Sequence, residues 1–339
     1  MKLVITIDTE EDNWGEYDLS SYSLQNIERI GRLQDLFDRF GVTPTYLVTY
    51  PVAIDKGATA LLRKIMEEGR CEIGAHCHPW NTPPFEETRN VRNSMLCNLP
   101  APLQRRKIMA LHEAIKTGFG IEPTSFRAGR WGLGEDTPDI LHHLGYRVDS
   151  SIIAFQNWEV YGGPDYSGAT PDLFCWANKV DTEAATMNRL LEFPATAGYA
   201  QGNSSFCNRL WLLSGWRLAR RLHARGILDR LGLLNKIWLS PETSSSAQMI
   251  TLTNAMKREG YGIINMFFHS TALMAGLSSF VQTKEDEEHF LRTIEDYLVF
   301  TGNAGIGSIK LADAPLHASG ELQQMQVTPT TMSNVTGKP

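Results

Sequence analysis

The segment CEIGAHCHPW (71–80) joins a short apolar run to two histidines that stand two residues apart. The run CEIGA has the length of a buried strand, and His76 follows it directly. Four other short apolar runs end in the same way, on Asp8, Arg127, Asp149 and His269. Parallel strands that present charged or titratable residues at their carboxyl ends are typical of a (β/α) barrel, which builds its active site at that edge. The sequence therefore predicts one site assembled from five strands.

Strand-like runs alternate with amphipathic segments along most of the chain, which predicts βαβ units and a parallel sheet of the α/β class. The expected strands are 3–7, 45–49, 71–75, 124–126, 146–148, 191–193 and 262–268. The expected helices are 24–40, 57–69, 102–118, 136–144, 246–259 and 284–299. In the first of these helices, apolar residues recur at intervals of three and four, and Gly41 is the expected stop.

Two regions interrupt this alternation, and we interpret both as insertions in a single barrel domain of residues 1–316. Residues 152–190 are aromatic and contain Gly and Pro, whereas residues 203–240 are basic and have a helical pattern. The last stretch, 317–339, is polar and contains Thr, Ser, Gln and Pro. Such a composition predicts a disordered tail.

Composition and charge exclude several classes of protein. The 339 residues carry a formal net charge of −6, which argues against a nucleic-acid binder, because such domains are usually basic. The five cysteines are scattered and odd in number, which favours reduced thiols over a disulfide framework. No apolar run approaches the roughly 20 residues that a membrane-spanning helix needs. We therefore expect a cytoplasmic protein.

The two histidines of the opening segment predict a metal site. Residues two apart in an extended segment point to the same side, so His76 and His78 can reach one ion. Imidazole suits Zn²⁺, and catalytic zinc sites usually take three protein ligands and a water. The third ligand is expected from the acidic run DTEED (8–12). The alternatives are a buried histidine beside an exposed one, and an acidic run that is a solvated loop.

Five motifs, in the same order along the chain, resemble those of the polysaccharide deacetylase family. They are TIDTEED (6–12), EIGAHCHPW (72–80), FRAGRWG (126–132), GYRVDSS (145–151) and NMFFHS (265–270). The chain departs from the family's pattern at three points: Thr9 replaces the second of two adjacent aspartates, the histidines stand two rather than four apart, and the arginine motif lacks its proline. It is thereby similar to a divergent subgroup associated with bacterial surface-polysaccharide synthesis.

The resemblance implies a distorted (β/α)7-type barrel that hydrolyses an N-acetyl group from an amino sugar in a saccharide. It also implies a divalent metal, most simply Zn²⁺, whose water is activated and which polarises the acetamide carbonyl. The implied residues are Glu10, His76 and His78 for the metal, Asp8, His269 and Arg127 for catalysis, and Trp131, Trp80 and Asp149 for substrate and oxyanion contacts.

In this interpretation Asp8 is the general base, His269 is the general acid, and Arg127 orients Asp8. Whether Asp8 or Glu10 is the metal ligand stays open. Two other functions also stay open: a metal-dependent amidase acting on a small non-sugar amide, and a catalytically silent carbohydrate-binding barrel. Tryptophans in the motif loops suit stacking on sugar faces and favour a saccharide, and a silent barrel would need neither base nor acid.

The segment 209–239 carries seven basic residues and one acidic residue, interleaved with tryptophans and leucines. A basic segment with an apolar face is typical of proteins that lie on an anionic membrane surface. In the alternative, two short helices pack their leucines on the barrel and show their arginines to water. Gly226 and Gly232, which divide the segment, favour that alternative.

Overall fold

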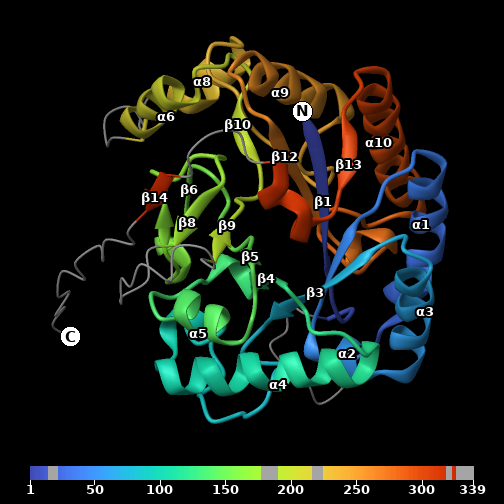
Figure 1. The fold of residues 1–339 in the computed structure, drawn as a ribbon. Coiled ribbons are helices and arrows are strands. Elements are labelled where there is room, and N and C mark those ends of the chain that lie inside the picture. The colour runs from blue at the N-terminus through green and yellow to red at the C-terminus, as the bar shows by residue number, and fades with distance from the viewer. Residues whose placement is uncertain (14–21, 177–189, 216–223, 318–322, 326–339) are drawn as a thin grey trace, which may run out of the picture.

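The computed structural model describes residues 1–13, 22–176, 190–215, 224–317 and 323–325. Seven parallel strands curl around one centre, and helices cover their outer side (Figure 1). In spatial order the strands are β12 (Ile263–His269), β1 (Lys2–Thr9), β2 (Thr45–Val48), β3 (Glu72–Cys77), β4 (Ser125–Ala128), β5 (Val148–Asp149) and β9 (Leu191–Glu192). Each of these strands overlaps one of the seven predicted from the sequence, so the predicted parallel sheet is confirmed.

The two ends of this series are joined through a short segment after β9. Thr196 donates its backbone N–H to the carbonyl of Asn265, 3.1 Å away. In return, the backbone N–H of Asn265 donates to the Thr196 hydroxyl at 2.8 Å. The barrel is therefore distorted at this point. One backbone hydrogen bond and one hydrogen bond to a side chain stand where a regular barrel would have a continuous ladder between β9 and β12.

Helices lie where the sequence predicts them, with two differences: the short helix α2 (Tyr50–Ile54) was not predicted, and the first helix begins differently. The helices are α1 (Ile30–Arg39), α2, α3 (Lys56–Glu67), α4 (Ala101–Phe119), α5 (Thr137–His143), α9 (Ser246–Arg258) and α10 (Lys284–Asn303). The helix expected at 24–40 instead begins with a 3-10 turn, η2 (Gln25–Arg29). The Asp12 carboxylate accepts the backbone N–H groups of Gln25 and Asn26, which ties this turn to the end of β1.

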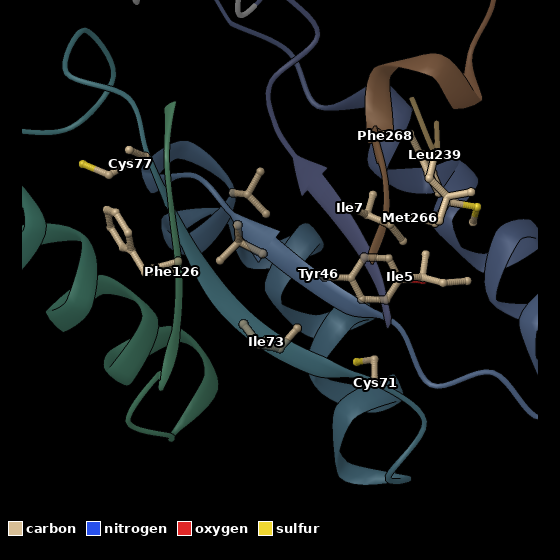
Figure 2. Packing of buried hydrophobic residues seen from close by; sticks show 14 of the residues in the cluster. Ile5, Ile7, Tyr46, Cys71, Ile73, Cys77, Phe126, Leu239, Met266 and Phe268 are labelled. Carbon is tan, nitrogen blue, oxygen red and sulfur yellow. The ribbon is translucent and has the colours of Figure 1, made fainter. Parts of the chain in front are cut away.

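Side chains along β1 point alternately outward, toward the helices, and inward, toward the centre of the barrel. Ile5 and Ile7 pack outward with Met266 and Phe268 of β12, in the cluster that faces the helices (Figure 2). Val4 belongs to a second, smaller cluster. Successive residues of a strand point to opposite faces, so Thr6 and Asp8 lie on the same inner face as Val4. The inner face is thus apolar at one end and polar where the strands finish.

The two regions expected to be insertions contain short elements, and one of these, β8 (Phe174–Trp176), extends the main sheet by pairing with β9. The first contains β6 (Gln156–Asn157), η5 (Glu159–Tyr161), β7 (Asp165–Tyr166) and β8. The second contains α6 (Ser204–Leu213), α8 (Ala224–Arg230) and β11 (Lys236–Trp238), which pairs with β10 (Ala197–Tyr199). Residues 177–189 and 216–223 of these insertions lie outside the described residues.

Near the C-terminus, β13 (Gly307–Ile309) pairs with β1, and η8 (Leu311–His317) follows it. A short strand, β14 (Gln323–Met325), pairs with β8 and is an exception to the disordered tail expected at 317–339. Residues 318–322 and 326–339 of that expected tail lie outside the described residues. Within the described part of the chain, none of the helices has the length and apolar character required to span a bilayer.

Candidate metal centre and active site

The strand register brings the predicted site residues together at the carboxyl edge of the barrel. Asp8 lies opposite His269 on neighbouring strands, and His76 lies opposite Arg127. Glu10 lies two residues after Asp8, and His78 lies two residues after His76, at the same edge. All six side chains except His269 are almost completely buried.

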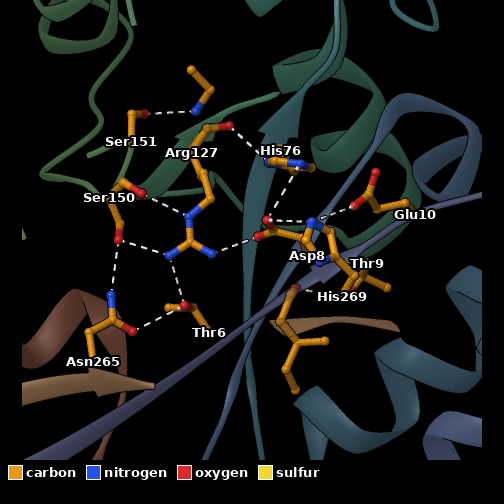
Figure 3. A network of polar contacts seen from close by, with 12 residues as sticks. Thr6, Asp8, Thr9, Glu10, His76, Arg127, Ser150, Ser151, Asn265 and His269 are labelled. Carbon is orange, nitrogen blue, oxygen red and sulfur yellow. Dashed lines mark hydrogen bonds and ion pairs between the residues drawn. The ribbon is translucent and has the colours of Figure 1, made fainter. Parts of the chain in front are cut away.

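Arg127 and Asp8 form a buried ion pair at the base of the site (Figure 3). One guanidinium nitrogen, Nη1, donates to Oδ1 of Asp8 at 2.7 Å. The remaining donors bind Thr6 and both the hydroxyl and the carbonyl of Ser150. Burial alone would raise the pKa of Asp8, but the charge and hydrogen bond of Arg127, together with His76 and His269, hold that pKa below its usual range. Asp8 is therefore ionised, with Oδ2 left facing the histidines.

The acidic run after β1 is buried, which excludes the solvated-loop interpretation. Glu10 and Glu11 are 0% and 1% exposed. Both oxygens of Glu11 accept hydrogen bonds from the Asn81 amide, and Thr49 donates to one of them. Burial raises the pKa of Glu11, and it raises that of Glu10 much further. A carboxyl in such surroundings gains from a cationic partner.

The two histidines are held as neutral imidazoles. His76 directs Nδ1 at the carbonyl of Arg127, 3.1 Å away, which assigns the proton to Nδ1 and leaves Nε2 as an acceptor. Burial lowers the pKa of His76 to about 4 and that of His78 well below its usual value. Metal ions bind neutral imidazole, so both rings have the required protonation state.

Glu10, His76 and His78 have the chemistry of a metal site. One donor atom from each lies within 4.8 Å of the others. The Glu10 oxygen Oε2 is 2.8 Å from Nε2 of His78. The other oxygen, Oε1, is buried, has no hydrogen-bond partner among the described residues, and lies 3.7 Å from Nε2 of His269. A divalent cation would satisfy this carboxylate, and one carboxylate with two imidazoles is a common catalytic zinc set. Asp8, Glu10 and His269 form a second possible group that shares Glu10.

His269 differs from the other two histidines because a carboxylate supports it. Its Nδ1 lies 3.0 and 3.1 Å from the two oxygens of Glu242, and its backbone N–H donates to the same carboxylate. Burial alone would lower the pKa of His269, but the charge and hydrogen bond of Glu242, together with the charges of Glu10 and Asp8, raise that pKa to about 10. The side chain is 20% exposed. His269 is therefore a cationic proton donor that solvent can reach.

Glu242 is a site residue that the predicted strands do not point to. It lies in SPETSSS (240–246), directly after the apolar residues IWL, and so repeats the pattern of a polar residue after a short strand. The strand before Glu242, β11, ends at Trp238. This strand lies in the region 203–240, whose sequence pattern predicts helices. The sequence therefore does not predict a strand that ends close to Glu242.

Trp80 and Asp149 are placed where they support the site. Trp80 is 3% exposed, its ring lies 4.0 Å from that of His78, and it hydrogen-bonds Glu11. Its packing thus fixes His78, which differs from the sugar contact expected of it. Asp149 has no exposed surface and accepts a hydrogen bond from Ser151. A substrate contact by Asp149 stays a prediction, and it would require movement of the residues that cover this carboxyl.

Asp149 also shares its surroundings with a second acid, Glu192. The two carboxyls are hydrogen-bonded to one another, and burial raises the pKa of Asp149 to about 6 and that of Glu192 well above its usual value. Like charges this close cannot both ionise, so the pair holds a proton. Through Ser151, which accepts the backbone N–H of Ala128, this pair is connected to the end of β4.

Trp131 lies beside the ion pair on a strained turn. The guanidinium of Arg127 is 4.8 Å from its ring centre. Arg130 and Trp131 have φ angles of 55° and 60°, in the left-handed region, which costs about 1–3 kcal/mol each. The hydroxyl of Tyr166 donates to the Trp131 carbonyl and holds this turn. Such strain at the carboxyl edge is typical of functional loops.

A cleft of about 440 Å³ opens beside His269. Its lining is mostly hydroxyl, amide and carboxylate groups, with one aromatic ring. The lining residues are Asp12, Asn13, Ser23, Glu242, His269, Thr271, Gly276, Leu277, Ser278, Ser279 and Phe280. The cleft therefore gives a polar ligand access to the exposed side of His269.

Several proteins of known structure share this fold. The "putative polysaccharide deacetylase from Mycobacterium smegmatis" aligns with a TM-score of 0.58 and 14% identity, over 96% of this chain and 93% of that one. A 4-alpha-glucanotransferase from Thermococcus litoralis aligns at 0.57 and 9%, over 96% and 41%. Puue allantoinase aligns at 0.50 and 10%, over 94% and 92%. No family model and no curated protein sequence matches the chain.

These likenesses show the fold. They confirm the distorted (β/α) barrel, and the first of them agrees with the resemblance that the five motifs suggest. At these low identities they do not carry an activity over to this chain, since one barrel supports many chemistries. The function must be argued from the side chains at the carboxyl edge.

We predict that Gly129→Ala weakens metal binding through His78. A Cβ at Gly129 would lie 2.1 Å from Nδ1 of His78, so the ring must move. Displacing a ligand in this way should reduce zinc affinity by roughly tenfold or more, measured by titration calorimetry. Gly168→Ala is the matched control, because nothing lies within 4 Å of its added Cβ. Equal zinc affinity in the two variants would remove His78 from the ligand set.

Proposed function

We propose that this protein is a metal-dependent hydrolase that removes the N-acetyl group from an amino sugar in a saccharide, with zinc as its metal. The observation that carries the proposal is that neighbouring side chains at one edge of the barrel have different protonation states. Asp8 is ionised against Arg127, His76 and His78 are neutral beside Glu10, and His269 is protonated against Glu242. Amide hydrolysis needs a base, an electrophile and an acid, and the site supplies a candidate for each.

Glu10, His76 and His78 would hold the metal, which when bound lowers the pKa of a water and polarises an amide carbonyl. Asp8 accepts a proton from the attacking water at Oδ2, the oxygen that Arg127 leaves free. The Nε2 atom of His269 lies 3.8 Å from that oxygen. As the C–N bond breaks, His269 gives its proton to the departing amine, and acetate and the free amino sugar leave.

The saccharide substrate is supported by the motifs and by the cleft. The cleft beside His269 presents hydroxyl and amide side chains, which can hydrogen-bond sugar hydroxyls, and one aromatic ring, Phe280. The order of the five motifs resembles that of polysaccharide deacetylases, which supports a role in the synthesis of a bacterial surface polysaccharide. An oxyanion contact from the backbone near Trp131 belongs to the same proposal.

We predict that Glu10→Gln and Asp8→Asn fail in different ways. Glu10→Gln removes a ligand charge and should lower the zinc content of the purified protein well below one per chain. Asp8→Asn should keep zinc near one per chain and lose acetate release, because Asp8 is the proposed base and lies outside the proposed ligand set. Metal content is measured by mass spectrometry, and acetate is assayed on a panel of N-acetylated saccharides and small amides.

An empty metal site in Asp8→Asn would assign Asp8 as a ligand and reverse the two roles. If the zinc-loaded wild-type protein releases acetate from none of the saccharides, the proposed deacetylase activity is contradicted. If it hydrolyses only the small amides, it is an amidase instead.

We predict that the His269–Glu242 pair sets kcat. His269→Ala should lower kcat by roughly 10²–10⁴, the usual effect of losing a general acid. Glu242→Gln should lower kcat in the same direction but less, because the ring stays while its charge loses support. The matched control is Glu122→Gln, which changes another carboxylate paired with a histidine, His112, 2.7 Å away. A Glu242→Gln enzyme with wild-type kcat would show that this pair is structural.

A further inference from the structure

Helix α6 has its polarity reversed relative to an ordinary surface helix. It turns Phe206, Leu210 and Leu213 outward, with exposed fractions of 55%, 39% and 60%. These residues stand at i, i+4 and i+7 and share one face. The residues that it buries are small or polar: Ser204, Cys207 and Asn208. A surface helix normally buries its apolar stripe, so the outward stripe needs a partner.

Hydrogen bonds fix this orientation. Asn208 accepts from the hydroxyl of Tyr199 at 3.0 Å and donates to the carbonyl of Ser167 at 2.7 Å. At the N-terminus of the helix, the Glu259 carboxylate accepts the backbone N–H of Ser204 at 3.0 Å. Rotating the helix to bury its leucines would break all three of these contacts. The apolar face is therefore held outward by the barrel itself.

Helix α8 and the turn after it extend the same apolar surface. Ile227, Leu231 and Leu233 are 52%, 65% and 59% exposed. Trp211 of α6 and Leu228 of α8 both pack against the same hydrophobic cluster. The two helices lie together at one corner of the molecule in Figure 1. Of the seventeen exposed large hydrophobic residues in the described chain, seven fall between 206 and 233.

The charge of this region is opposite to that of the chain. Segment 209–239 holds seven basic residues against one acidic residue, whereas the whole chain has a net charge of −6. Arg209 and Arg230, within the described residues, are exposed on the two helices. An apolar stripe flanked by arginines matches an anionic bilayer, where acyl chains receive the apolar residues and headgroups receive the cations.

We propose that α6 and α8 form a docking face for an anionic membrane surface. This face consists of Phe206, Leu210, Leu212, Leu213, Ile227, Leu231 and Leu233, with Arg209 and Arg230. A second copy of the chain fits less well, because two such basic segments would repel one another. The alternative expected from the sequence, in which the leucines pack on the barrel, does not hold for these residues, since their side chains are exposed.

The test is sedimentation of the full chain with two kinds of vesicle. One is pure phosphatidylcholine, and the other contains equal parts of phosphatidylcholine and phosphatidylglycerol. Binding to the anionic vesicles should be at least tenfold stronger at low salt and should weaken at high salt, because the charge term is screened. Arg209→Gln with Arg230→Gln should weaken it by about fivefold per arginine.

Leu213→Ser with Leu231→Ser should reduce binding at least tenfold on the same vesicles. The matched control is Val160→Ser with Leu316→Ser, two residues that are 82% and 80% exposed elsewhere on the surface. All four positions are exposed, so circular dichroism should show unchanged thermal unfolding.

Three results would overturn the proposal. The first is no binding to anionic vesicles at low salt, and the second is equal binding by the leucine and control variants. The third is a wild-type protein that binds no vesicles but forms a dimer in light scattering, which Leu213→Ser with Leu231→Ser dissociates. The last would assign the face to a second copy.

Discussion

Arg127 is a cation with no exposed surface, so each of its donors needs an acceptor inside the barrel. Those acceptors come from β1 and from the residues after β5, while its carbonyl orients His76 on β3. Asn265 of β12 joins the same network by donating to the hydroxyl of Ser150. The interior polar end of the barrel is thus built around one charge. Removing one partner of such a buried pair typically costs about 3–5 kcal/mol, because the other charge is left uncompensated.

This constraint also explains why neighbouring titratable groups differ in protonation. Asp8 is buried as deeply as Glu10, yet the pKa of Asp8 is lowered and that of Glu10 is raised, because only Asp8 contacts the guanidinium. His76 and His269 both lie 3.8 Å from Asp8, but His269 is also hydrogen-bonded to Glu242 and lies 3.7 Å from Glu10, and these carboxylates raise its pKa. Paired groups whose environments push their pKa values apart are the usual mark of acid and base roles.

Much of the fold was predictable, because each strand is a short apolar run that ends on a polar residue. Asp8, His76, Arg127 and His269 were found by that pattern, and the strand register brings them together. Glu242 and the support given by Trp80 were not found, since they depend on how β11 and the loop after β3 return to the barrel. The sequence left two orientations open for the apolar residues of 209–239, outward or packed on the barrel, and the hydrogen bonds of Asn208 show which way α6 points.

The central claim is that one set of side chains holds the metal and a different set moves protons. Anomalous scattering at the zinc edge, from crystals grown with zinc, tests it most directly. The account predicts one peak within bonding distance of Glu10, His76 and His78, with Asp8 still bound to Arg127 and His269 still bound to Glu242. A peak coordinated by Asp8, Glu10 and His269 would contradict it, because the proposed base and acid would then be ligands.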